Sequence, residues 1–171
     1  MKVLNLTTVK QICRVGGELE SDLLVVLSNQ VEATVSEYTG LLWEPEDITM
    51  TASGGGENLW PPQGPINSVS EVRHIEDDYV VSSTWYEVIR NNRIKSHTRW
   101  IDGYYKITAN VGYATVPDEL IGIMYALVKR AYISSGGVSN ESSAGHQVAM
   151  WQIHTTDEWR QLRKYKLGDI L

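Results

Sequence analysis

The spacing of apolar residues changes twice along the chain, and this change limits the possible folds more than any other feature. Between 18 and 38, apolar residues recur every three or four positions, which is the period of an amphipathic helix. Between 48 and 52, and again between 105 and 111, they alternate with polar residues as in a half-buried strand. The helical period then returns from 118 to about 133. The sequence therefore predicts an α+β fold.

Four helices are expected. The first spans 7–15, with Thr7 or Thr8 as its cap, and the second spans 18–38 and stops at Gly40. The third begins around Thr115, and the fourth runs from 155 to 168. These segments predict a small helical bundle with a C-terminal tail helix.

The segment between the second and third helices is predicted to be an inserted antiparallel β unit. Its strongest signal is Asp102–Gly103, which predicts a hairpin between strands 98–101 and 104–111. Other strands are expected at 48–53, 69–75, 79–81, 85–89 and 93–95. The domains predicted are a helical core of 1–43 and 114–147, a β unit of 44–113 and a C-terminal segment of 148–171.

Composition excludes several classes of protein. The longest apolar run, 23–27, is far shorter than the roughly 20 residues of a membrane-spanning helix. The first residues lack the apolar stretch of a secretory signal, so synthesis in the cytosol is expected. The single Cys13 excludes an internal disulfide and zinc sites that require several cysteines.

No catalytic, cofactor-binding or metal-binding motif is found, so the chain is not expected to be an enzyme. The four histidines show no paired spacing. His146 and His154 could gather a metal with Asp157 and Glu158, but scattered histidines with surface or hydrogen-bonding roles are the favoured interpretation. A small enzyme of unrecognised type stays open as the weakest alternative.

Charge is distributed unevenly along the 171 residues. The formal net charge of -6 arises within residues 1–60, which carry nine acidic and three basic side chains. Residues 159–166 instead carry four basic side chains and no acidic one. An acidic end and a basic end indicate contact with other protein surfaces, which is favoured over nucleic-acid binding.

The aromatic residues allow a second interpretation. The chain has 6 Trp and 9 Tyr but no Phe, so every large ring carries a polar group. Such rings are common at interfaces and can stack on sugars. A Trp-rich carbohydrate- or protein-binding module is therefore an alternative function.

Four stretches resemble the head-to-tail connector family of tailed bacteriophages, also called adaptors or head completion proteins. The most specific is Ile107 to Leu120, which runs from a strand through Gly-Tyr and Val-Pro-Asp into a helix. The others are 6–10, 35–40 and 65–72. Together the four cover residues 6 to about 133.

The resemblance implies a structural virion protein at the neck, where the head meets the tail. Family members form a ring, typically of twelve copies, under the portal protein and extend the DNA channel. They bind neighbouring copies and a downstream neck or tail protein, and they contact DNA transiently during genome packaging and ejection. No membrane contact is implied.

The resemblance also assigns the C-terminal segment to portal docking. Its expected contact residues are Trp159, Arg160, Leu162, Arg163, Lys164, Tyr165 and Lys166. Acidic residues are expected to line the channel, because an acidic wall does not hold the phosphates of passing DNA. The candidates are Glu18, Glu20 and Asp22.

Overall fold

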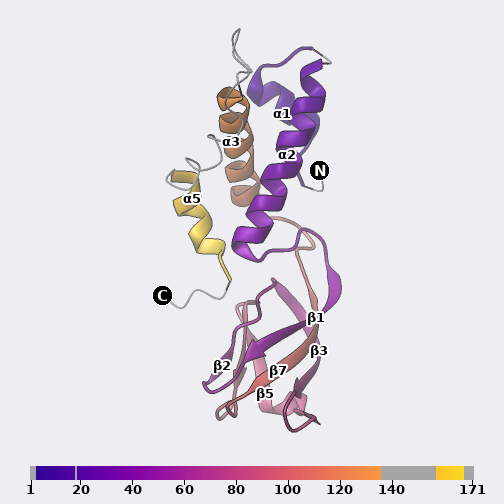
Figure 1. Cartoon of the computed structure of the whole chain (residues 1–171), viewed down its shortest axis with the longest axis vertical. Coiled ribbons are helices and arrows are strands. Elements are labelled where there is room, and N and C mark those ends of the chain that lie inside the picture. Colours follow the sequence, from indigo (N-terminus) through magenta and orange to yellow (C-terminus); the bar gives the residue numbers. More distant parts are fainter. Residues whose placement is uncertain (1–2, 18, 136–156, 168–171) are drawn as a thin grey trace. The chain divides into compact units, whose positions relative to one another are not determined.

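The computed structural model describes residues 3–17, 19–135 and 157–167, and they fall into two compact units. The helical unit comprises the described residues of 1–39 and 116–165, and the β unit those of 40–115 and 166–171. All the described strands follow the second helix and precede the third (Figure 1). The predicted α+β fold with an inserted antiparallel β unit is therefore confirmed.

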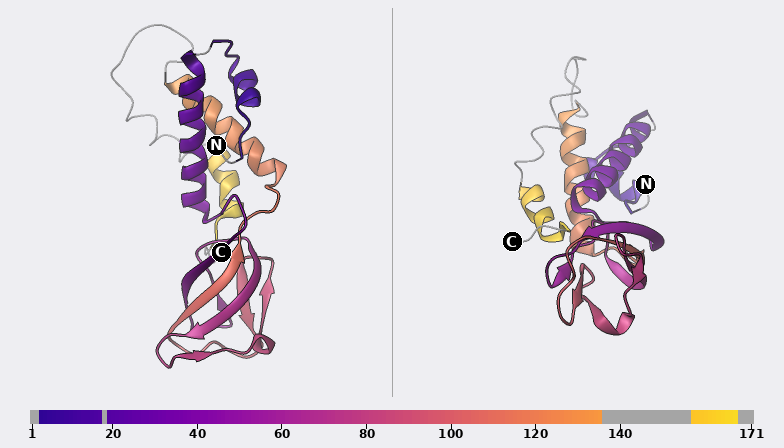
Figure 2. Two further views of the ribbon diagram at one scale, coloured as in Figure 1. Left: turned by 90° about the vertical axis from the view of Figure 1, so that its right-hand side faces the viewer. Right: turned by 60° about the horizontal axis from the view of Figure 1, so that its bottom comes forward.

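The helical unit is built on two long helices that pack against each other. α2 (Leu19–Thr39) and α3 (Asp118–Ser134) lie side by side, with α1 (Leu6–Cys13) and α5 (Asp157–Leu162) beside them (Figures 1 and 2). A 3-10 turn, η3 (Arg163–Tyr165), follows α5. The core consists of apolar side chains at helical spacing, including Leu24, Val31, Val35, Leu120, Met124, Leu127 and Val128.

The start of α1 differs from its prediction. Asn5, not Thr7 or Thr8, is the N-cap, and its Oδ1 accepts hydrogen bonds from the Thr7 and Thr8 amides at 2.9 and 3.3 Å. The two threonines thus supply the amides that the cap satisfies. The helix ends at Cys13 and its C-cap is Arg14, whose φ of 58° is left-handed. α2 ends at Thr39 before Gly40, as predicted.

A buried carboxylate holds the N-terminal segment against the helices. Glu32 on α2 is 5% exposed. Its Oε1 accepts hydrogen bonds from the amides of Val3 and Leu4 at 3.2 and 2.8 Å. On α3, the hydroxyl of Tyr125 accepts a third bond from the Asn5 amide at 3.1 Å. Residues far apart in sequence therefore hold residues 3–5 against α2 and α3.

The third helix starts later than predicted. Pro117 occupies the cap position without a side-chain hydrogen bond, and the helix begins at Asp118. The predicted start around Thr115 therefore lies three residues too early. The fourth helix is described from Asp157, and the predicted start at 155–156 lies outside the described residues.

The β unit contains two antiparallel sheets. The first has the order β1 (Glu46–Ser53), β7 (Tyr104–Val111), β3 (Ile66–His74) and β4 (Tyr79–Val80). The second has the order β2 (Asn58–Leu59), β6 (Arg93–Ser96) and β5 (Tyr86–Ile89), and a 3-10 turn, η1 (Ser83–Trp85), precedes β5. One hydrophobic cluster joins both sheets: Met50, Ala52, Leu59, Ile66, Val72, Ile94, Trp100, Tyr105, Ile107, Ala109 and Val111.

The predicted hairpin at Asp102–Gly103 is wrong. β7 pairs with β1 and β3, whereas residues 98–101 form no strand. The segment before β7 lies instead beside the glycines at 54–56. The Gly54 amide donates to the Gly103 carbonyl at 2.7 Å, and the Trp100 amide donates to the Gly56 carbonyl at 2.8 Å. Trp100 explains the difference, because its buried ring donates Nε1–H to the Ile94 carbonyl at 3.2 Å and so holds this segment against the second sheet.

Gly112 ends β7 in a conformation that needs glycine. Its φ is 116°, and a Cβ at this position would overlap the Glu44 carbonyl oxygen. Its amide donates to the Pro65 carbonyl at 2.8 Å. The Gly-Tyr step of the sequence motif is therefore a packing requirement.

Candidate interaction surfaces

The C-terminal segment buries the two apolar residues that the sequence assigned to portal docking. Trp159 is 3% exposed and Leu162 is fully buried. The Trp159 ring meets the edge of Tyr38 on α2, with 4.7 Å between ring centroids. The apolar face of α5 therefore packs on the chain's own helices, and other side chains must make any contact with a partner.

The basic side chains of this segment lie on its outer side. Arg160, Arg163 and Lys164 are exposed, whereas Tyr165 and Lys166 are half-buried. Arg160 pairs with Asp157 at 3.1 Å, and the Lys164 amine lies 3.6 Å from Glu119. Such exposed ion pairs contribute little, about 0–1 kcal/mol each. The outer side of α5 and η3 can therefore exchange these pairs for a partner's acidic groups.

Two further contacts fix this basic segment on α3. The Tyr165 hydroxyl donates to Glu119 at 2.8 Å, and Arg130 on α3 donates to Glu158 at 2.7 Å. Both contacts connect α3 with the C-terminal segment. Sequence periodicity predicts the apolar face of α5 but gives no sign of these polar pairs.

The structure describes two of the three candidate channel acids, Glu20 and Asp22. Glu18 lies outside the described residues. The Glu20 carboxylate accepts a hydrogen bond from the Tyr132 hydroxyl of α3 at 3.2 Å, and Asp22 is exposed. Burial, and then the Glu20 charge, raise the pKa of Tyr132. Glu20 thus has a structural role, whereas Asp22 presents its charge to solvent.

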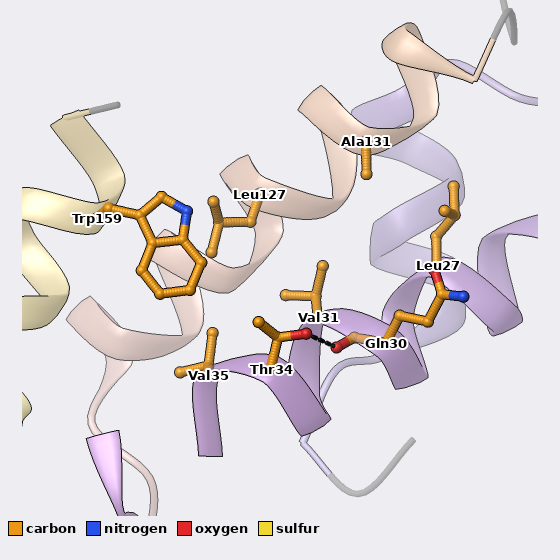
Figure 3. Close-up of a pocket in the computed structure, with 8 residues that line it drawn as sticks. All are labelled: Leu27, Gln30, Val31, Thr34, Val35, Leu127, Ala131 and Trp159. Atoms are coloured by element: carbon orange, nitrogen blue, oxygen red, sulfur yellow. Dashed lines mark hydrogen bonds between the residues drawn. The ribbon is translucent and has the colours of Figure 1, made fainter. Parts of the chain in front are cut away.

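A small apolar hollow of about 30 Å³ lies among α2, α3 and α5 (Figure 3). Trp159 forms one side, and Leu127 and Val31 face it from α3 and α2. Its polar member Thr34 donates its hydroxyl to the Gln30 carbonyl at 2.7 Å. The remaining lining residues are Leu27, Val35 and Ala131. The hollow belongs to the packing of α5 and brings no chemically reactive groups together.

The β unit carries most of the exposed large hydrophobic side chains of the described residues. They lie on β3–β4, η1 and the 98–104 segment: Ile75 46%, Tyr79 37%, Val80 51%, Trp85 60%, Ile101 58% and Tyr104 58% exposed. Four of them, Tyr79, Val80, Trp85 and Ile101, line a hollow of about 500 Å³ together with Arg99 and Trp100. Exposed apolar surface of this kind marks an interaction site. The absence of Phe hinted at interface residues, but the sequence did not show where they gather.

Sequence reasoning also missed a polar cluster around His74. The ring is 2% exposed, and its Nδ1 and Nε2 lie 3.1 and 3.4 Å from the carboxylates of Asp77 and Glu76. Glu76 also accepts the Tyr104 amide at 3.0 Å. The cluster therefore ties the β3–β4 turn to the start of β7.

Two tyrosine rings enclose His74. Tyr79 stacks on it at 5.3 Å, and Tyr105 meets its edge at 4.9 Å between centroids. Burial, with smaller contributions from Tyr79, raises the pKa of Tyr105 to about 12. The arrangement therefore holds the β3–β4 turn in place.

The described residues bring no metal-binding group together. They contain no group of three or more His, Cys, Asp or Glu that could hold a metal ion. Burial raises the pKa of the Cys13 thiol, which disfavours the reactive thiolate. His146 and His154 lie outside the described residues. None of the described helices is long and apolar enough to cross a membrane.

No protein-family model matches the chain, and no curated protein matches it. Solved structures do match. A chain in the neck of an empty gene transfer agent particle, computed with C6 symmetry, is 16% identical with a TM-score of 0.59, over 99% of this chain and 92% of that one. A chain in the virion of a native gene transfer agent particle is 13% identical with a TM-score of 0.60, over the same shares of both chains.

A third match comes from the neck of a native gene transfer agent particle computed with C12 symmetry. It is 12% identical, has a TM-score of 0.54, and covers 87% of this chain and 84% of that one. This chain therefore has the fold of chains from such necks. The resemblance to head-to-tail connectors, expected from the sequence, is confirmed for the fold.

Proposed function

We propose that the chain is a structural protein of a phage-like virion neck. The observation that carries this proposal is the match to a neck chain over 99% of this chain, which includes both the helices and the inserted β unit.

Within the neck, we propose that the chain is the head-to-tail adaptor. Copies would form a ring under the portal, extend the DNA channel and receive the downstream neck or tail protein. One of the matched necks was computed with C12 symmetry, which agrees with a ring of twelve copies. The acidic and basic regions of the chain suit contact with different neighbours in a layered assembly.

Native mass spectrometry of the full chain, alone and with the portal protein of the same particle, tests the adaptor role. A ring that forms alone or on the portal supports it. A chain that stays monomeric and does not bind portal in any state would overturn it.

For portal docking, the exposed bases carry the proposal, because Trp159 and Leu162 are buried. Arg160→Glu with Arg163→Glu should abolish co-purification with portal rings, since both side chains point outward from α5 and η3. Lys106→Glu changes an exposed base on β7 and serves as the control. Deletion of 157–171 should have the same result as the double variant. Portal binding retained by the double variant would contradict this docking surface.

For the channel wall, Asp22 is the candidate whose replacement leaves the Glu20–Tyr132 contact in place. Asp22→Lys in assembled particles should slow genome passage, and Glu18, Glu20 and Asp22 all changed to Lys should slow it further, because lysine binds phosphate. Glu57→Lys, at an exposed position in the β unit, is the control. Unchanged ejection kinetics in the triple variant would count against an acidic channel.

The hollow of the β unit supports a second candidate function, a carbohydrate- or protein-binding module. Trp85 and Ile101 are 60% and 58% exposed beside it, and an exposed indole can stack on a sugar. Glycan-array binding by the full chain, lost in Trp85→Ala, would favour this function. Binding to no glycan would leave the neck role as the better account of this surface.

A further inference from the structure

β1 is a long edge strand whose outer side is open. It lies at the end of the four-stranded sheet and pairs with β7 over its whole length, without a bulge. The other end strands, β4, β2 and β5, have only two, two and four residues. Within the described chain, β1 is therefore the longest edge available for pairing.

The pairing pattern shows which backbone groups face outward. Gly54, directly after β1, donates its amide to Gly103, which stands opposite it. Because hydrogen-bonded pairs alternate along an antiparallel ladder, the even-numbered residues of β1 bond to β7. The N–H and C=O groups of the odd-numbered residues consequently point away from the sheet: Asp47, Thr49, Thr51 and Ser53.

Solvent reaches this edge, and little protects it. Asp47, Thr49, Thr51 and Ser53 are all exposed, and no other strand of the described chain pairs with the outer side of β1. Natural edge strands are usually blocked by proline, charged side chains or a bulge. β1 has no proline and no bulge, and its two charged residues, Glu46 and Asp47, stand at its first end, so the rest of its outer side is suited to pairing with another strand.

We propose that β1 of one copy pairs with β1 of a second copy, antiparallel and centred on Met50. This register places Thr49 opposite Thr51 of the partner subunit and Asp47 opposite Ser53 of the partner subunit. Each outward-facing N–H or C=O group of β1 then lies opposite an outward-facing backbone group of the second copy. Main-chain hydrogen bonds would join the two four-stranded sheets into one.

The side chains of β1 are complementary to themselves in this register. Residues directly opposite each other lie on the same face of a sheet. Ile48, Met50 and Ala52 point to the core side of β1. In the joined sheet they would lie beside the same three residues of the second copy, on that same side. The exposed threonines would form cross-strand pairs on the other side, which are favourable. Both faces of the joined sheet therefore match.

Charge selects the antiparallel arrangement. Glu46 and Asp47 stand at one end of β1, and the rest of the strand is uncharged. Antiparallel pairing sets these acids beside the uncharged end of the partner's strand, whereas parallel pairing would set them against each other. Like charges directly opposite are unfavourable.

This pairing is two-fold and closed, so it does not continue from copy to copy as the contacts of a ring do. It concerns the free chain, in which it would cover an edge that otherwise promotes aggregation. It does not depend on the proposed neck function, and a portal-binding experiment would not decide it.

The test measures self-association of the full chain by sedimentation velocity over a range of concentrations. Thr49→Lys with Thr51→Lys places lysine opposite lysine at both threonine pairs and should weaken the dimer by about tenfold or more. Thr49→Lys with Thr51→Glu instead places lysine opposite glutamate and should restore dimerisation. Only an antiparallel register centred on Met50 gives this reversal.

A backbone variant tests the hydrogen bonds themselves. Thr51→Pro removes an amide that points outward, a position where sheets tolerate proline, so the fold should be kept and the dimer lost. Thr51→Val retains the amide and should still dimerise. A wild-type chain that is monomeric at every concentration, or a dimer that survives Thr51→Pro or the double-lysine change in folded protein, overturns the proposal.

Discussion

In the β unit, hydrophobic side chains from both sheets form one continuous core cluster, whereas the helical unit adds to its apolar core polar contacts that hold its N-terminal and C-terminal segments. Glu32 holds the amides of Val3 and Leu4, and Tyr165 and Arg130 connect α3 with the C-terminal segment. The difference suggests different responses to substitution. A lost contact in the helical unit should release one segment, whereas a lost core side chain in the β unit should weaken all its strands.

The largest effect is expected for Trp159→Ala. Trp159 is 3% exposed and packs on Tyr38, and truncation of a buried Trp costs about 3–5 kcal/mol. Urea unfolding measures the loss, and hydrogen exchange should show α5 losing protection before α2 and α3. Arg160→Ala, on the exposed side of the same helix, should change stability by no more than about 0.5 kcal/mol.

Ile107→Ala should destabilise the β unit by about 2–5 kcal/mol. Ile107 is fully buried in the central strand β7, which pairs with β1 and β3. Hydrogen exchange should show faster exchange across both sheets and little change in α2 and α3. Equal loss of protection in the helices would mean that the two units unfold together, and the proposed contrast would fail.

Glu32→Ala should cost about 1–3 kcal/mol, because it leaves two amides without their acceptor. Amide exchange at Val3 and Leu4 should accelerate strongly, while the β unit stays unchanged. Glu32→Gln keeps one carbonyl oxygen and should have a smaller effect. If the alanine variant left these two amides protected, the carboxylate would not be what holds the N-terminal segment.

Tyr105 gives the β unit a dependence on alkaline pH. Its pKa is raised to about 12, above the ordinary value near 10, so the folded state holds the proton more tightly than the unfolded state. The corresponding stabilisation is complete below pH 10 and is lost as the pH rises towards 12. Urea unfolding between these values should show a smaller decline for Tyr105→Phe than for the wild type. Tyr104→Phe, at a ring that is 58% exposed, should decline like the wild type.

Periodicity predicts the helices and most strands correctly because each depends on residues close in sequence. The second helix and the alternation of Tyr105 to Val111 belong to this group. The hairpin at Asp102–Gly103 was wrong because a turn signal is local, whereas the choice of strand partner is not. Burial of Trp100 and pairing of β7 with β1 decide the outcome there.

The interaction surfaces were harder to predict for a similar reason. The spacing of Trp159 and Leu162 indicates an apolar face, but it does not say whether the chain or a partner covers that face. The structure shows that the chain covers it. Likewise, Trp85 and Ile101 lie 16 positions apart in sequence, and only the fold of the β unit brings them to one hollow.

Gly112 has a consequence for how sequences of this fold can vary. A Cβ at this position would overlap the Glu44 carbonyl, and the φ of 116° already disfavours other residues. Any substitution must therefore move either the exit of β7 or the entry of β1. The glycine of the Gly-Tyr motif is therefore required by the packing between the end of β7 and the start of β1, and not by a binding partner. Chains of this fold can keep the motif and still bind different partners.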